Sequence, residues 1–230
     1  MRFSKWHGLG NDYLVIERAE AGGPLAPPMV QRLCDRHQGV GADGVLEIVA
    51  VEGSLADIVI WNPDGSTAEL SGNGTRIVAR WLARHGDRDD VRVRVASRTV
   101  DAIVGRDGVV EQALGPVAVG AVEDLELEDE VVEFTPVSVG NPHAVLRHDP
   151  RPVEVRRLGP LIEEHRRFPD RTNVQLVRVD GIRRITVGVW ERGAGETRSS
   201  GTSAAAAAAA AVANGWCGSP VEVRLPGGEL

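Results

Sequence analysis

Lysine is nearly absent from the sequence, because Lys5 is the single lysine among 26 basic residues and the others are arginines. An enzyme that uses pyridoxal phosphate needs a lysine to form a Schiff base with the cofactor. Lys5 lies in a short strand-like segment near the N-terminus, which is a poor position for that role. The sequence therefore argues against pyridoxal chemistry.

Cysteine is also scarce, and the two examples are Cys34 and Cys217. They form no C-x-x-C pair, and no cysteine and histidine residues share the spacing of a zinc site. A single disulfide between them is one interpretation. We favour two buried or half-buried thiols in a reducing cytoplasm, and we expect no bound metal.

Long apolar runs and an excess of positive charge are missing too. No run reaches the roughly 18 residues of a membrane-spanning helix, and the first twenty residues lack the layout of a signal peptide. The net charge is −7 and the pI is about 5.4, whereas a nucleic-acid binder shows a basic patch. We therefore expect a cytoplasmic protein that binds neither nucleic acid nor membrane.

The sequence contains an internal repeat, which is a feature to look for before any other. Residues 71–86 read SGNGTRIVARWLARHG and residues 200–215 read SGTSAAAAAAAAVANG. Both segments open with Ser-Gly and close with Gly, and they lie 129 residues apart. The sequence therefore indicates two copies of one unit.

Further matches keep nearly the same spacing. The strand-like runs that end at Trp61 and Trp190 are also 129 residues apart, and the Gly-Asn pairs that end at Asn11 and Asn141 are 130 apart. We expect one domain over residues 1–115 and a second over residues 116–230. Whether the last strand, 221–225, packs back on the first domain is left open.

Each copy is predicted to hold several strands and one helix. Alternating runs rich in Val and Ile indicate the strands, at residues 13–17, 45–50, 57–61, 91–95, 99–104, 109–114, 174–179, 185–190 and 221–225. A serine N-cap precedes each helix and a glycine ends it, which predicts helices over 72–85 and 201–214. The second helix carries alanine on every side, so we expect this helix to be buried.

These elements predict an α+β fold of two pseudo-symmetric domains. Each domain is expected to be a curled, mixed but largely antiparallel sheet, barrel-like in form, around a central helix. Because a helix start carries unpaired N–H groups and partial positive charge, it binds carboxylates. Two such starts could hold one small acid, with Ser71 and Ser200 on opposite faces. The simpler interpretation is that both serines are ordinary N-caps.

Polar motifs surround both predicted helices in a fixed order. They are HGLGND at 7–12, NPDG at 62–65, SGNG at 71–74, GNPH at 140–143, RTN at 171–173, ERGAGET at 191–197 and SSGT at 199–202. The ordered set closely resembles the diaminopimelate epimerase family, and the match runs from His7 to about Gly228. The resemblance implies a cofactor-independent amino-acid epimerase or racemase that uses neither a metal nor an organic cofactor.

The resemblance also implies which residues bind the substrate. The asparagines hold its polar groups, the helix starts at 72–73 and 201–202 bind its carboxylate, and Arg192 pairs with a distal carboxylate. The nine matching positions are Asn11, Asn62, Gly72, Asn73, Asn141, Asn173, Arg192, Gly201 and Thr202.

Four further positions match the catalytic residues of the family. His143 and Glu191 match the residues that assist proton transfer at the reacting carbon. Ser71 and Ser200 stand where the family carries two cysteine thiolates that act as bases. A thiol near a helix start has a pKa lowered to roughly 3.5–7.5, whereas a serine hydroxyl is a far weaker acid. Ser199 and Ser203 differ from the family as well, which favours natural divergence.

Three functions remain open from the sequence. The first is inversion at Cα of an amino acid, with LL- or meso-diaminopimelate, a precursor of lysine and peptidoglycan, as the substrate. The second is a binding protein that keeps the pocket and has lost the chemistry. The third is an epimerase or lyase acting on another amino acid. A small-molecule substrate is expected in each case, and a homodimer is left open.

Overall fold

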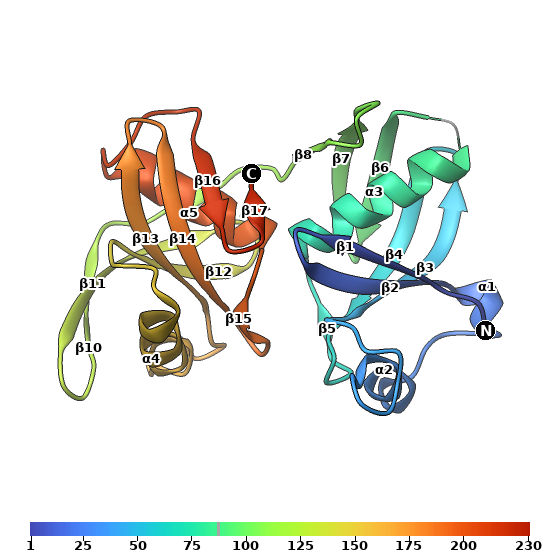
Figure 1. Cartoon of the computed structure of the whole chain (residues 1–230), viewed down its shortest axis with the longest axis horizontal. Helices are drawn as coiled ribbons and strands as arrows, with labels where there is room; N and C mark the ends of the chain where they lie inside the picture. Colours follow the sequence, from blue (N-terminus) through green and yellow to red (C-terminus); the bar gives the residue numbers. More distant parts are fainter. Residues whose placement is uncertain (87) are drawn as a thin grey trace. The chain divides into compact units, whose positions relative to one another are not determined.

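The computed structural model describes residues 1–86 and 88–230. The chain forms two compact units, Met1–Gly115 and Pro116–Leu230, and Figure 1 shows a curled sheet with one long helix in each.

The first unit is a mixed sheet with strand order β1-β2-β3-β4-β6-β7-β8, and β5 pairs with β4. The pairs β2–β3 and β4–β6 are parallel, and the other pairs are antiparallel. The elements are β1 (Ser4–Gly8), β2 (Asn11–Glu17), α1 (Arg18–Ala21), α2 (Pro27–Cys34), β3 (Val45–Glu52), β4 (Leu55–Trp61), β5 (Thr67–Ala68), α3 (Gly72–Gly86), β6 (Asp90–Val95), β7 (Arg98–Val104) and β8 (Val110–Ala113).

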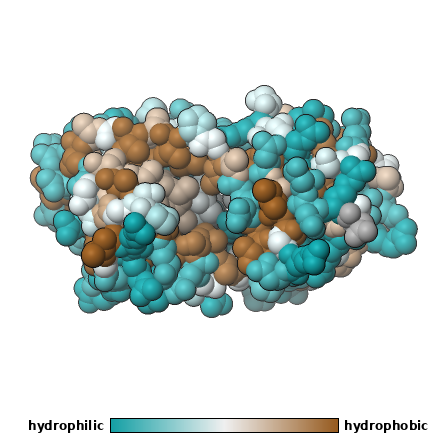
Figure 2. All heavy atoms as spheres, turned by 90° about the horizontal axis from the view of Figure 1, so that it is seen from above, coloured by the Kyte–Doolittle hydropathy of each residue, from teal (hydrophilic) through white to brown (hydrophobic). Residues whose placement is uncertain are grey.

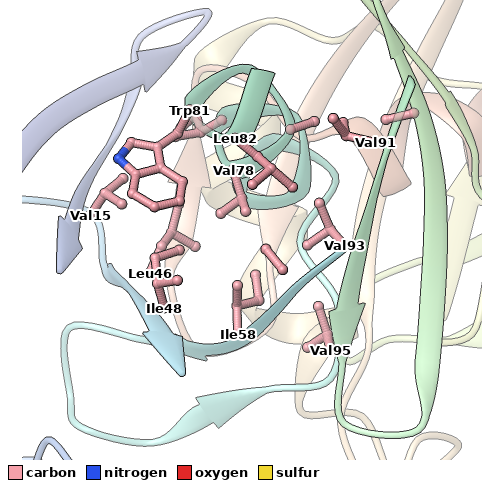
Figure 3. Packing of buried hydrophobic residues seen from close by; sticks show 14 of the residues in the cluster. Val15, Leu46, Ile48, Ile58, Val78, Trp81, Leu82, Val91, Val93 and Val95 are labelled. Carbon is pink, nitrogen blue, oxygen red and sulfur yellow. The ribbon is translucent and has the colours of Figure 1, made fainter. Parts of the chain in front are cut away.

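Helix α3 fills the inside of this curled sheet. It contacts β1, β2, β4, β6, β7 and β8. Burial alternates along β4 and β6, as expected for strands with one face on a core. In Figure 3, the helix side chains Val78, Trp81 and Leu82 turn toward strand side chains that include Leu46 and Ile58, and all five are buried. Packing against the helix therefore holds the first unit together.

The second unit is a sheet with strand order β10-β11-β12-β13-β14-β16-β17, to which β9 and β15 add at β11 and β14. The pairs β12–β13 and β14–β16 are parallel. The elements are β9 (Ala118–Val119), β10 (Glu123–Glu126), β11 (Val131–Ser138), β12 (Pro142–Leu146), α4 (Pro152–Glu163), β13 (Asn173–Gly181), β14 (Arg184–Glu191), β15 (Gly195–Thr197), α5 (Gly201–Ala213), β16 (Glu222–Leu225) and β17 (Gly228–Glu229).

The alanine helix α5 is the counterpart of α3. It contacts β11, β12, β13 and β14, and Ala206, Ala207, Ala210 and Ala211 are fully buried. The small methyl groups let the surrounding strands approach the helix closely. The strand expected over 221–225 is β16. The sequence left open whether this strand packs on the first domain, and in the structure it pairs with β14 of its own unit.

The two units repeat one pattern of strand pairing. Val45 pairs with Trp61 in the first unit, and Val174 pairs with Trp190 in the second. Both parallel pairs and both central helices recur in the same order, so the prediction of a pseudo-symmetric α+β fold is confirmed. The copies differ at one end, because β8 follows the β6–β7 hairpin in the first unit whereas β17, of two residues, ends the second sheet.

The surface carries hydrophobic residues among hydrophilic ones, as the face in Figure 2 shows. The side chain with the largest exposed fraction among the large hydrophobic ones is Ile182, at 85%, in the turn between β13 and β14. Within the described residues, no helix combines the length and the apolar character that a membrane span requires.

Candidate active site

Ser71 is the N-cap of α3. The backbone N–H of Gly74 donates to Ser71 Oγ at 3.0 Å, and the N–H of Thr75 donates to the Ser71 carbonyl oxygen at 2.9 Å. The phenol oxygen of Tyr13 lies 3.2 Å from Ser71 Oγ. The half-buried serine is therefore held by the helix on one side and by a strand residue on the other.

Asn11 and Asn73 form a polar chain beside Ser71. The side-chain nitrogen of Asn73 donates to Asn11 Oδ1 at 3.1 Å, and the side-chain nitrogen of Asn11 donates to Asp43 Oδ2 at 2.9 Å. Arg76 donates to Asn73 Oδ1. Both asparagines are buried, so these bonds fix the orientation of two predicted substrate-binding residues at the start of α3.

Asp12, next to Asn11 in β2, pairs with two cationic side chains, Lys5 and Arg36. Burial raises the pKa of Asp12, but hydrogen bonds from Arg36 and Lys5 outweigh that effect and hold the pKa well below its usual range. Lys5 lies 2.9 Å from Asp12 and also donates to the Gly41 carbonyl oxygen at 2.6 Å. The only lysine of the chain is thus engaged in an ion pair.

Two buried glutamates brace the strands that lead to the other predicted residues. Glu47 accepts a hydrogen bond from the Trp61 indole at 2.9 Å, just before Asn62. In the second unit, Glu163 accepts from the Trp190 indole at 2.7 Å and from the Gly193 N–H at 2.8 Å. Glu163 therefore holds both sides of the segment that carries Glu191 and Arg192.

Asn62 makes its hydrogen bonds within its own loop. Its side-chain nitrogen donates to Ser66 Oγ at 2.9 Å, and its backbone N–H donates to the Ser66 carbonyl oxygen at 2.8 Å. The backbone N–H of Gly65 donates back to the Asn62 carbonyl oxygen at 3.0 Å. This loop keeps the half-buried asparagine at the end of β4.

Ser200 is the N-cap of α5. Its Oγ accepts from the Ser203 N–H at 3.4 Å, and the serine is 6% exposed. Ser203 Oγ in turn accepts from the side-chain nitrogen of Gln175 at 3.1 Å. Gly201 and Thr202 are also buried. The second helix start therefore adds two polar side chains, Ser203 and Gln175, to the serine.

His143 is buried beside this polar group, with 1% of its surface exposed. Burial lowers its pKa to about 3; hydrogen bonding with Gln175 opposes this effect, and the positive charge of Arg192 adds to it. Its Nε2 lies 2.9 Å from Asn141 Oδ1. The imidazole is thus neutral at physiological pH.

The remaining predicted residues of the second unit gather at the ends of β13 and β14. Asn173 Oδ1 accepts from the Arg192 N–H at 3.0 Å, and its side-chain nitrogen donates to the Pro142 carbonyl oxygen at 2.8 Å. Arg192 donates to the Asp170 carbonyl oxygen at 3.2 Å, and Thr197 donates to Glu191 Oε1 at 3.2 Å.

The surroundings of both cysteines disfavour a thiolate. Burial raises the pKa of Cys34 to about 11, and the charges of Asp12 and Asp43 add to the effect. Burial also raises the pKa of Cys217. Both thiols are free. Across residues 1–86 and 88–230, no group of three or more His, Cys, Asp and Glu side chains is arranged to hold a metal ion.

Each unit thus assembles a polar set at the start of its central helix. Ser71, Asn11 and Asn73 come together in the first unit, and Ser200 adjoins Ser203 in the second. The sequence did not single out four residues that support the site: Tyr13 and Gln175 belong to these sets, and Glu47 and Glu163 brace the neighbouring strands. The repeat could have pointed to Tyr13, because Tyr13 lies 130 positions before His143, the same spacing as between the two Gly-Asn pairs.

Comparison with known proteins connects this arrangement to one family. The family model described as "Diaminopimelate epimerase" matches residues 3–119 and 135–230. The diaminopimelate epimerase of Stutzerimonas stutzeri (strain A1501) is 39% identical over 247 residues, and that of Azotobacter vinelandii (strain DJ / ATCC BAA-1303) is 40% identical. In each case the alignment covers 100% of this chain and 90% of the relative.

Solved structures share the fold at lower identity. A probable proline racemase from Agrobacterium radiobacter K84, with bound carbonate, superposes with a TM-score of 0.75 at 18% identity, covering 99% of this chain and 82% of that one. A hydroxyproline epimerase from Agrobacterium vitis, with bound trans-4-OH-L-proline, gives the same values.

Proposed function

Because the chain belongs to the diaminopimelate epimerase family and is an isomerase, we propose that it inverts the configuration at Cα of an amino acid without a cofactor. LL- and meso-diaminopimelate, precursors of lysine and peptidoglycan, are the proposed substrates. The observation that carries the proposal is the identity of 39% across the whole chain to enzymes of that name, together with the polar sets at both helix starts.

The starts of α3 and α5 are proposed to bind the α-carboxylate. Both helices begin with a glycine, and Gly72, Asn73, Gly201 and Thr202 are buried. Unpaired N–H groups and the partial positive charge of a helix start favour an anion there. Neutralising the negative charge of the bound carboxylate would also make the neighbouring Cα–H more acidic.

Arg192 is proposed to select a substrate with a second carboxylate. Its backbone is fixed by Asn173 and by the segment that Glu163 braces, so its guanidinium starts from a defined place. An arginine presents a planar fork that suits a carboxylate. Its charge reaches His143, where it lowers the pKa, so Arg192 and the assisting histidine belong to one local set.

Proton transfer at Cα is proposed to use Ser71 and Ser200, one removing the proton and the other delivering one to the opposite face. His143 and Glu191 assist. The neutral imidazole can donate or accept a hydrogen bond, and the Glu191 carboxylate, which accepts from Thr197, can orient the amino group. Both serines accept helix N–H groups, which stabilise negative charge on Oγ.

The serine pair favours a second candidate function. General acid–base catalysis contributes typically 10²–10⁴-fold and works best when the pKa of the group is near the operating pH. A hydroxyl is a poorer match than the thiols of the family, so a chain that binds diaminopimelate without turning it over is the alternative.

Incubation with LL-diaminopimelate in D₂O separates these functions. We expect deuterium to appear at Cα together with the meso isomer, both followed by NMR. A Ser71→Ala, Ser200→Ala variant is the control for background exchange, and calorimetry measures binding in parallel. Binding without exchange above the control would support the binding protein, and release of a group from a β-substituted amino acid would support a lyase.

A further inference from the structure

Tyr13 occupies in the first repeat the position that His143 occupies in the second. In the parallel pair β2–β3, Leu14 lies opposite Val45, and in the parallel pair β12–β13, Ala144 lies opposite Val174. The residue before each is Tyr13 or His143. Both side chains therefore extend from equivalent points of equivalent strands, at the start of the central helix of their unit.

The surroundings of Tyr13 fix its phenol beside Ser71. The side chain is 8% exposed, and its ring lies directly on the backbone of Gly44, where a Cβ would come within 2.7 Å of Tyr13 Cε1. The phenol oxygen is 3.2 Å from Ser71 Oγ. A ring held by packing in this way delivers its hydroxyl to one place.

In the second unit, Ser200 Oγ accepts the backbone N–H of Ser203, and Ser203 Oγ accepts from the side-chain nitrogen of Gln175. Ser203 and Gln175 correspond by the repeat to Gly74 and Leu46, which carry no polar side chain. A Cβ at Gly74 would lie 2.9 Å from Leu46 Cδ2, so no side chain fits there. The first unit therefore lacks these two polar side chains, and its titratable side chain, Tyr13, contacts the serine directly.

Ser71 needs such a partner if it moves protons. Its Oγ already accepts the Gly74 N–H, and a serine that removes a proton from carbon must pass its own hydroxyl proton to another group. A phenol is a much stronger acid than an aliphatic hydroxyl, with an ordinary pKa of about 10, so its anion is the more accessible proton acceptor.

We infer that Tyr13 is the proton partner of Ser71, a positioning residue that acts through the serine on the substrate. When the Cα–H bond breaks, its electron pair stays on Cα and the proton joins Ser71 Oγ, while the Ser71 hydroxyl proton passes to the Tyr13 phenolate. In the reverse direction, the Tyr13 hydroxyl returns a proton to Ser71 as Ser71 protonates Cα. The inference rests on the proposed function.

The test compares Tyr13→Phe in the natural chain and in a Ser71→Cys chain. Release of tritium from Cα is measured separately with LL-diaminopimelate and with the meso isomer labelled at its D centre. Since Tyr13→Phe removes one oxygen and keeps the ring on Gly44, the fold should persist. We expect release from one isomer to fall by about 10²-fold or more and release from the other to change little.

In the Ser71→Cys chain, Tyr13→Phe should change release of either isomer by less than about threefold, because a thiolate removes the proton without a partner. Thr75→Val is the matched control, since the Thr75 hydroxyl donates to the Ser71 carbonyl oxygen at 2.9 Å rather than to Oγ. It should leave the ratio of the two isomers unchanged.

Other outcomes separate the inference from the proposed function. Equal slowing of both isomers, or equal slowing in the serine and cysteine chains, overturns the relay and leaves the function standing. Tritium release from another amino acid but not from diaminopimelate, with the same dependence on Tyr13, would show that diaminopimelate is not the substrate and would support the relay. Release from no amino acid contradicts both.

Discussion

The buried neutral His143 should make the protein sensitive to mild acid. Its pKa is about 3 in the folded chain, against an ordinary value of 6.5. Between those values the unfolded chain binds a proton that the folded chain rejects, so folding loses free energy as the pH falls through this window. The stabilisation is complete above pH 6.5, where the residue is neutral in both states.

The size of the effect follows from the width of the window. Each pH unit is worth about 1.4 kcal/mol, so acidification from pH 6.5 to pH 5 should cost about 2 kcal/mol and the whole window roughly 5 kcal/mol. That is a large part of the stability of an ordinary domain. His143→Gln removes the titrating group and keeps a side chain that can donate and accept hydrogen bonds.

Urea unfolding at pH 7 and at pH 5, followed by circular dichroism, measures this contribution. The loss of unfolding free energy between the two values should be about 2 kcal/mol smaller in His143→Gln than in the natural chain. Carboxylates titrate in both proteins and cancel in the comparison. The exposed His37 gives a control, because His37→Gln should keep the natural pH dependence. The same pH dependence in all three proteins would show that His143 does not contribute this loss of stability.

Three further predictions concern the helix starts and the braced segment. Arg192→Ala should weaken binding of diaminopimelate in calorimetry more than binding of a monocarboxylic amino acid; equal losses would remove Arg192 from the distal carboxylate. Glu163→Gln should destabilise the chain by about 1–3 kcal/mol and weaken diaminopimelate binding, whereas Glu164→Gln, at its exposed neighbour, should do neither; matched affinities would contradict the bracing role. Ser71→Ala should lower the free energy of urea unfolding by about 1 kcal/mol through loss of the N-cap, while Ser71→Gly should cost only a few tenths; equal costs would count against the cap.

Much of the fold could be predicted because its strongest signals are local. Serine before and glycine after an apolar segment mark the ends of a helix, and this placed α3 and α5 within a residue of their observed bounds. The alternating runs became β3, β4, β13 and β14. The repeat predicted the two-domain organisation, since two copies of one unit are expected to fold in the same way.

The elements that escaped prediction depend on tertiary contacts. β5, β9 and β17 have two residues each, too few for any period to show, and they exist because a neighbouring strand offers hydrogen bonds. Helix α4 contains Pro160, which argues against a helix when the sequence is considered alone. Its buried face on β13 and β14 outweighs the proline.

The candidate site divides in the same manner. Motifs identify residues such as Asn11 and Arg192, because polar residues in a fixed order are recognisable without coordinates. Tyr13 resembles an ordinary core aromatic in an alternating strand, and only its distance from Ser71 gives it a role. Glu163 ends a helix, and its function appears once the indole of Trp190 and the N–H of Gly193 are seen to bind it.

We propose that this chain keeps the binding groups of a diaminopimelate epimerase and carries serine at its two proton-transfer positions. The rate of conversion of LL-diaminopimelate to the meso isomer, compared between the natural chain and the Ser71→Cys, Ser200→Cys variant with affinity measured for both, tests this proposal. We expect closely similar affinities and a rate at least about 10²-fold higher in the double cysteine variant. A double cysteine variant that binds diaminopimelate and inverts none of it would show that the two serines are not the proton-transfer positions.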